Sequence, residues 1–221
     1  MFSFIVLSII LAAGIDFLSA DVVVYTSGNY KLTIVNNDPN FDQNTRQRCI
    51  DTFFATMPQM CDRFNRNGCT RDVVITIDPG YNGVAYASGG SIVISAAWLR
   101  SNPQDTDVVT HECMHVVQRY PRGDPGWLIE GIADYARWKY GRNNPAANWW
   151  LPPFEMNHHF TNAYRVTARF LAWCEKRYSN IVVQLDSAMR SNTYSGNSWN
   201  QFAEGKSVEQ LWSEYAQNPN F

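Results

Sequence analysis

Two histidines and a glutamate in the middle of the chain have the spacing of metal-site residues on a helix. His111, Glu112 and His115 fall in residues 108–118 (VVTHECMHVVQ), whose valines recur at helical spacing. Side chains four residues apart project from one helix face, so both imidazoles can reach one ion. Glu112 lies one residue further round, where its carboxylate can hold a water and take its proton. The pattern predicts a hydrolytic Zn²⁺ site with His111 and His115 as ligands and Glu112 as the general base.

A third protein ligand is needed, because catalytic zinc has three such ligands and one open position. Some zinc enzymes place a third histidine six residues after the second, behind a glycine. Those positions hold Pro121 and Gln118 here, which excludes that arrangement. The third ligand must therefore come from a later segment.

The next helical segment is residues 124–141 (DPGWLIEGIADYARWKYG). Asp124 can cap its start, Pro125 suits the first helical position, and Gly141 suits the exit. Asp124 could also bind the metal, but its capping role already explains it. It is the weaker candidate for the third ligand.

Glu130 and Asp134 stand four residues apart on one face of this predicted helix. We expect Glu130 to be the third zinc ligand and Asp134 to orient a ligand imidazole through a hydrogen bond. Gly131 removes side-chain bulk where the two helices approach the metal, which favours Glu130 as the inner residue.

The elements that must position these residues divide the chain into two halves. Strand-like runs between turn signals are residues 22–26, 30–35, 72–78, 83–87 and 91–95. Residues 42–65 have helical spacing, with Pro58 kinking or ending the helix. From Pro103 onward the pattern is helical. We predict one α+β domain over residues 21–221, with an N-terminal mixed-sheet lobe that includes the long helix and a C-terminal helical lobe.

The first residues predict a signal peptide. Residues 2–18 are almost continuously apolar, and small residues follow up to Ala20. The run is short for a membrane span and is interrupted by Asp16, although no Lys or Arg precedes it. A buried strand or a membrane anchor is the alternative. We expect residues 1–20 to be removed and the mature protein to be secreted, without stable membrane insertion.

Five cysteines cannot all pair within one chain. Cys61 and Cys69 flank a short polar turn and are the easiest pair to close. Cys113 and Cys174 lie in apolar helical patterns, where a thiol usually packs as a small hydrophobic side chain, and a bridge between them stays open. Cys49 is the fifth.

Composition excludes a disordered protein and argues against a nucleic-acid-binding one. The chain of 221 residues is 45% hydrophobic, which is too apolar for a disordered protein. Its net charge of −2 gives no basic bias toward nucleic acid.

Several segments carry a resemblance to a known family. Residues 127–133 (WLIEGIA), after the histidine motif, resemble the gluzincin metallopeptidases. Closer similarity is to the plant basic secretory protein family of peptidase-like proteins, also found in bacteria and fungi. It lies in residues 82–95 (NGVAYASGGSIVIS), 111–118 (HECMHVVQ), 128–137 (LIEGIADYAR), 164–171 (YRVTARFL) and 206–215 (KSVEQLWSEY).

The resemblance implies a secreted, zinc-dependent peptidase of zincin-like fold, with the zinc site between the two lobes. It implies His111, His115 and Glu130 as ligands and Glu112 as the general base. The expected partner is a peptide or protein substrate, with no nucleic acid, and we expect a monomer. The chain is mildly acidic, although the family is named for basic proteins. Partners that the family name suggests are therefore not assumed for this chain.

Amide hydrolysis also needs a hydrogen-bond donor for the developing oxyanion. The candidates are Tyr164, His158, His159 and Tyr135. We favour Tyr164, because it opens a predicted helix whose start can aim a hydroxyl inward.

The substrate is expected to bind as an added strand along an exposed sheet edge. Residues 91–95 are the candidate edge. Trp149, Trp150 and Phe154 either line a pocket or belong to the core.

Two other functions remain possible from sequence. A secreted binding or defence protein could carry a structural zinc, but such a site needs no general base like Glu112. A zinc hydrolase acting on another amide or ester would show the same motif.

Overall fold

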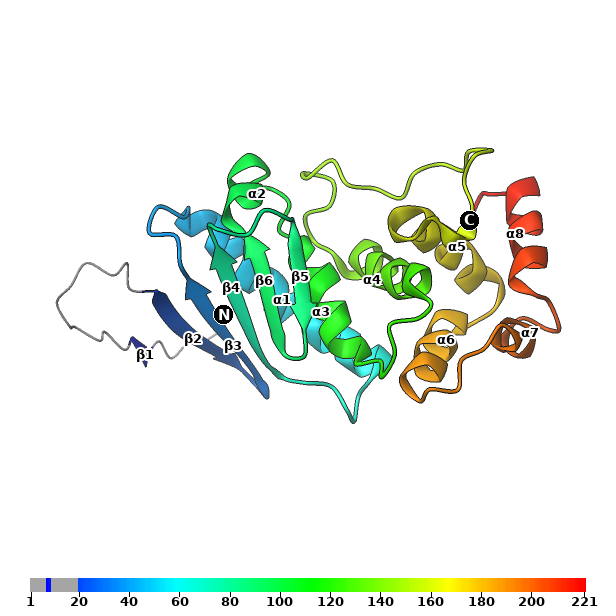
Figure 1. Cartoon of the computed structure of the whole chain (residues 1–221), viewed down its shortest axis with the longest axis horizontal. Helices are drawn as coiled ribbons and strands as arrows, with labels where there is room; N and C mark the ends of the chain where they lie inside the picture. The colour runs from blue at the N-terminus through cyan, green and yellow to red at the C-terminus, as the bar shows by residue number, and fades with distance from the viewer. Residues whose placement is uncertain (1–6, 9–19) are drawn as a thin grey trace.

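The N-terminal half of the chain forms a mixed β-sheet (Figure 1). The computed structural model of the protein describes residues 7–8 and 20–221. The strands are β1 (Leu7–Ser8), β2 (Asp21–Ser27), β3 (Tyr30–Asn36), β4 (Asp72–Asp78), β5 (Ala85–Ser88) and β6 (Ser91–Ser95). Their order is β1-β2-β3-β4-β6-β5, with β3, β4 and β6 parallel. β2 and β5 run antiparallel to their neighbours, and the five predicted strands are confirmed.

The sheet buries one of its faces. Buried and half-buried residues alternate along β3 and β4, as expected for strands with one covered face. The buried apolar residues of the sheet include Leu32, Ile34, Val73, Ile75, Ile77, Ile92 and Ile94.

The helix α1 (Gln43–Phe64) lies behind this sheet in Figure 1 and supplies a second layer of the core. It begins after Asp42, whose carboxylate accepts a hydrogen bond from the Thr45 N–H at 2.7 Å. Pro58 lies inside the helix, which continues to Phe64, so the alternative in which Pro58 ends the helix is wrong.

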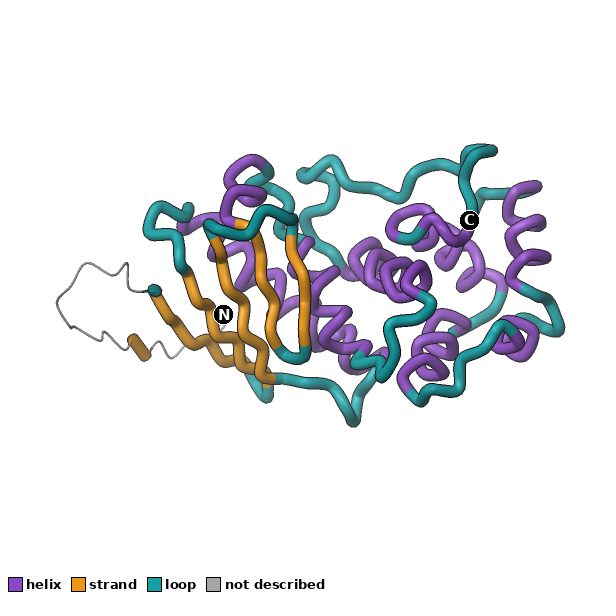
Figure 2. Tube along the Cα trace, in the orientation of Figure 1, coloured by secondary structure: helices purple, strands orange, loops and turns teal. Residues whose placement is uncertain are grey.

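The C-terminal half is helical, and Figure 2 shows its helices from residue 108 onward gathered on the side away from β2 and β3. The helices are α2 (Ala96–Ser101), α3 (Val108–Gln118), α4 (Gly126–Tyr140), η1 (Phe160–Asn162), α5 (Tyr164–Arg177), α6 (Ile181–Arg190), α7 (Asn197–Phe202) and α8 (Val208–Gln217). Residues 141–159, between α4 and η1, are not helical. Together with the sheet, these helices confirm the α+β class.

The disulfide Cys61–Cys69 joins the end of α1 to the segment before β4. This is the pair that the sequence favours. Cys49, Cys113 and Cys174 are free and buried, so a Cys113–Cys174 bridge is not formed.

The predicted signal peptide, residues 1–20, lies outside the described residues except for residues 7, 8 and 20. Within the described part of the chain, every helix is too short or too polar to cross a membrane.

Gly131 determines how closely α4 and α5 pack. A Cβ at this position would lie 2.7 Å from Thr167 Cβ and would also overlap the Thr167 methyl group. Thr167 cannot easily move, because it is fully buried and its hydroxyl donates to the Phe160 carbonyl at 2.6 Å. The prediction that Gly131 makes room between the two metal-site helices is therefore wrong. The glycine makes room for α5 on the other side of α4.

We predict that Gly131→Ala destabilises the fold. The methyl group would overlap Thr167 in a packed interior, where such overpacking costs about 1–3 kcal/mol. Thermal or denaturant unfolding measures the loss. Gly126→Ala is the matched control, because it lies in the same helix and its Cβ would meet nothing within 4 Å. Equal stability of the two variants would contradict this account of α4–α5 packing.

Candidate metal centre

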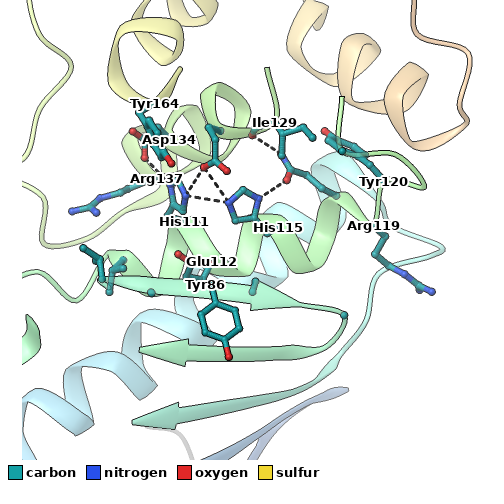
Figure 3. Close-up of a pocket in the computed structure, with 18 of the residues that line it drawn as sticks. Tyr86, His111, Glu112, His115, Arg119, Tyr120, Ile129, Asp134, Arg137 and Tyr164 are labelled. Atoms are coloured by element: carbon teal, nitrogen blue, oxygen red, sulfur yellow. Dashed lines mark hydrogen bonds and ion pairs between the residues drawn. The ribbon is translucent and has the colours of Figure 1, made fainter. Parts of the chain in front are cut away.

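α3 carries the histidine motif and is held almost entirely inside the protein. All of its residues except His115 are buried, and nearly every face of the helix packs against other elements. The His111 and His115 side chains leave α3 on the side that faces α4 (Figure 3). His111 is 8% exposed and Glu112 is 5% exposed. The side chains of the motif therefore extend from a helix that is packed on almost all sides.

α4 brings a carboxylate to both imidazoles. His111 Nε2 lies 3.1 Å from His115 Nε2, and Glu130 Oε2 lies 3.2 Å and 3.4 Å from these two nitrogens. Ligand atoms about 2.0–2.1 Å from a tetrahedral ion are about 3.3 Å apart. His111, His115 and Glu130 could therefore hold one metal ion, and their spacing matches three corners of a tetrahedron.

The outer nitrogen of each imidazole is fixed by a hydrogen bond. His111 Nδ1 lies 2.7 Å from Asp134 Oδ1, the contact that the helical spacing predicts. His115 Nδ1 lies 2.7 Å from Gln118 Oε1. Acceptors at both Nδ1 atoms favour the tautomer whose Nε2 lone pair faces the centre of the cluster.

Gln118 is the site residue that sequence reasoning missed. Its amide nitrogen donates to the Ile129 carbonyl at 2.9 Å, so one side chain links His115 to the residue before Glu130. The sequence does contain an indication of this role. Gln118 lies three residues after His115, so both side chains project from one face of α3.

The charges of the cluster favour a cation at its centre. Burial lowers the pKa of His111, but hydrogen bonds with Asp134 and Glu130 outweigh burial and raise it to about 10. Burial raises the pKa of Glu130, but hydrogen bonds with His111 and His115 outweigh this effect and lower it to about 2. The carboxylates of Glu130 and Asp134 thus stabilise a positive charge at the cluster. A divalent ion bound there would supply such a charge.

Glu112 differs from the other two acids. Its Oε2 is buried and has no hydrogen-bond partner among the described residues. Burial raises the pKa of this carboxyl group above its usual value. Leaving a buried acceptor without a hydrogen bond costs about 1–3 kcal/mol. We therefore expect this oxygen to bind a group that enters the site, such as a water or part of a substrate.

Tyr164 is the candidate oxyanion donor that lies beside the cluster. Its ring is stacked on the His111 ring, with centroids 6.2 Å apart and planes 17° apart, and it is 54% exposed. The charge of Glu130, followed by burial, raises the pKa of its hydroxyl. Ala163 and Tyr164 both have positive φ, a conformation that non-glycine residues adopt only where the surroundings impose it.

The other three candidates do not line the cavity at the cluster. Tyr135 is buried and accepts a hydrogen bond from Lys139 at 3.2 Å. His158 accepts a hydrogen bond from the Glu155 N–H, and His159 caps η1.

A cavity of about 1070 Å³ opens over the cluster, and β5 forms one of its walls. β6 lies between β4 and β5, so the prediction that residues 91–95 form the sheet edge is wrong. Strand order is set by long-range pairing, which local patterns do not reveal. Within the described sheet, β5 is the edge strand on the side of the cluster.

The free side of β5 has backbone groups available for a ligand. The Ser95 N–H donates to the Val84 carbonyl at 3.0 Å, which makes these two residues a hydrogen-bonded pair. Such pairs alternate along an antiparallel ladder, so the polar backbone groups of Ala85 and Ala87 face away from β6. Their small side chains allow a peptide to approach closely.

Of the predicted aromatic cluster, only Trp149 lines the cavity, where the Arg137 guanidinium lies 4.4 Å from its ring centroid. Trp150 is exposed. Phe154 packs against Trp212 and Tyr215 in the helical half.

The start of α4 also differs from the expectation. The helix begins at Gly126 with Pro125 at the N-cap and no side-chain cap, so Asp124 does not cap it. Asp124 is not part of the cluster either. Gly141 ends the helix as predicted.

Comparison with known proteins identifies the family of the chain. A family model described as a peptidase of plants and bacteria matches residues 20–215. None of the curated proteins matches the chain. The match covers both the sheet and the helices that carry the cluster, and it confirms the resemblance seen in the sequence. The chain belongs to the basic secretory protein family of peptidases.

Proposed function

We propose that the protein is a secreted zinc-dependent peptidase of zincin-like architecture, with the zinc held by His111, His115 and Glu130. The observation that carries the proposal is the triangle of three ligand atoms 3.1–3.4 Å apart, beside a buried carboxylate oxygen of Glu112 that has no partner among the described residues. Two imidazoles and one carboxylate form a donor set typical of catalytic zinc.

Zinc at this position would lower the pKa of a coordinated water toward about 7 and polarise the carbonyl of a bound peptide. Glu112 takes the proton from the attacking water. Burial raises the pKa of its carboxyl group, which makes the carboxylate a stronger base. It then gives that proton to the leaving amine. The Tyr164 hydroxyl donates a hydrogen bond to the developing oxyanion, and its exposure lets a substrate reach it. Asp134 and Gln118 hold the imidazoles in place.

The substrate is proposed to lie along β5 as an added strand. The backbone groups of Ala85 and Ala87 supply main-chain hydrogen bonds, and the cavity accepts side chains. This edge favours a peptide over another amide or ester, because only an extended chain can use a row of backbone partners.

A purely structural zinc explains less of the site. A structural ion is closed by four protein ligands. Here three ligand atoms lie at the wall of a large cavity, and Glu112 and Tyr164 line the same cavity.

Secretion is supported by two observations. Residues 2–18 have the pattern of a signal peptide. The Cys61–Cys69 disulfide is typical of proteins that fold in an oxidising compartment.

We predict that the protein binds one Zn²⁺ per chain and that His111→Ala or His115→Ala abolishes stoichiometric binding. Each change removes one of three ligands, so the remaining pair cannot hold the ion tightly. Metal analysis after dialysis measures the content. His158→Ala is the control, since this imidazole lies outside the cavity. Full zinc content in both cluster variants would exclude the site.

We predict that Glu112→Gln keeps the zinc and the fold but loses about 10²–10⁴-fold or more in peptide hydrolysis. The amide has nearly the same shape but cannot accept the proton. The measurement is kcat/KM on a peptide library, with and without a chelator, alongside metal content. Cleavage at the wild-type rate by Glu112→Gln would show that another group is the base.

We predict different losses for the two carboxylates of α4. Asp134→Asn should weaken zinc binding about 10–100-fold, because it removes only the partner of the His111 ring. Glu130→Gln should lose far more, because the ion keeps only two protein ligands. Competitive zinc titrations compare the two variants. A larger loss for Asp134→Asn would reverse the two roles.

A further inference from the structure

The ionisable residues that line the cavity follow a simple pattern of charge. Near the cluster they are His111, His115 and three acids, Glu112, Glu130 and Asp134. Away from the cluster, every charged residue among the described lining is an arginine. These are Arg119, Arg122, Arg137 and Arg165. The chain as a whole has a net charge of −2, so the sign of the cavity wall is opposite to that of the protein.

One of these arginines has a structural role. Arg137 is 6% exposed and forms an ion pair with Asp105. Its Nε also donates to Asn144 at 3.1 Å. Its charge is therefore neutralised within the fold, and Arg137 is not available to a ligand.

The other three have no acidic partner among the described residues. Arg119 is exposed and donates only to the Gly68 carbonyl, at 2.9 Å. Arg122 and Arg165 are exposed and form no ion pair or hydrogen bond in the described structure. Each therefore keeps its full charge for a molecule in the cavity. Arg122 and Arg165 also keep all their donor groups, and Arg119 keeps those that do not bind Gly68.

These arginines come from two separate segments of the chain. Arg119 follows the last residue of α3, four residues after His115, and the next residues, up to Gly123, also line the cavity. Figure 3 shows Arg119 and Tyr120 at the end of the cavity where α3 ends. Arg165 comes from the start of α5, next to Tyr164. A peptide lying along β5 in this cavity would thus meet positive groups from two different segments.

The carboxylates of the cluster do not cancel this charge. A divalent ion would balance all but one of them, and Glu130 and Asp134 are already engaged by the imidazoles. A cleft lined by one sign of charge focuses its field and attracts the opposite charge. Guanidinium groups also bind carboxylates through two parallel hydrogen bonds.

We propose that the peptidase prefers acidic peptides, whose Asp or Glu side chains near the scissile bond are bound by Arg119, Arg122 and Arg165. The proposal rests on the proposed function, because it assigns the substrate class of the same site. It adds that the cavity wall, not the metal cluster, selects the substrate.

The test uses three peptides of one sequence that differ only in the residues beside the cleavage position, which are Glu, Gln or Lys. For the wild-type protein, kcat/KM should fall on the order of tenfold from the Glu to the Gln peptide, and further for the Lys peptide. Added salt should narrow these ratios, because it screens the charges. Equal cleavage of all three peptides would overturn the preference and leave the peptidase intact. Failure to cleave any peptide, in these or in an unbiased library, would overturn the proposed function itself.

The triple variant Arg119→Gln/Arg122→Gln/Arg165→Gln assigns the preference to these residues. Its ratio of Glu-peptide to Gln-peptide cleavage should approach one, and Arg→Lys at the same positions should restore part of the ratio. Arg66→Gln is the control, because this exposed arginine lies outside the cavity. Retention of the full ratio by the triple variant would contradict the assignment.

Binding provides a readout that is independent of turnover. In the Glu112→Gln background, fluorescence anisotropy should show tighter binding of the labelled Glu peptide than of the Gln peptide. This difference should disappear when the three arginines are replaced. Equal binding of both peptides before replacement would contradict the proposal.

Discussion

The site depends on one constraint, which is that three polar atoms from two helices stay about 3 Å apart in a largely buried place. Helical spacing alone brings the His111 and His115 nitrogens together, because both belong to α3. Glu130 belongs to α4, so its place depends on how the two helices pack. Gln118 controls this directly, since it bonds both the His115 ring and the Ile129 carbonyl. A shift of α4 would break that bridge and separate the ligand atoms.

Buried charges fix α3 and α4 at the other end of their contact. Asp107, just before α3, accepts hydrogen bonds from the backbone N–H groups of Arg142 and Asn143, just after α4, at 2.9 Å and 2.5 Å. Asp105 pairs with Arg137 of α4. At the Gln118 end of α3, Arg190 of α6 bonds the last carbonyls of α1 and α3, at Phe64, Val117 and Gln118. Removing one partner of a buried ionic group is costly, so these contacts resist sliding of the helices.

The sequence predicts those features that depend on local spacing. Alternating residues reveal β3 and β4, and the four-residue steps His111–His115 and Glu130–Asp134 reveal the two faces that meet. Features that depend on distant packing were missed or misassigned. The edge position of β5 follows from the pairing of β4 with β6. The role of Gly131 follows from the approach of α5, and that of Gln118 from the nearness of the Ile129 carbonyl.

The metal cluster and the wall of the cavity differ in how firmly the fold holds their residues. The cluster draws its residues from α3 and α4, whose packing is held by buried hydrogen bonds and ion pairs. The wall draws on several segments that are far apart in the sequence, among them β5, residues 119–123 and the start of α5. Three arginines on this wall, Arg119, Arg122 and Arg165, are exposed and make few contacts within the fold. Exposed residues with few contacts can usually be replaced at little cost to stability. The charge of the wall can therefore change while the geometry of the cluster stays the same.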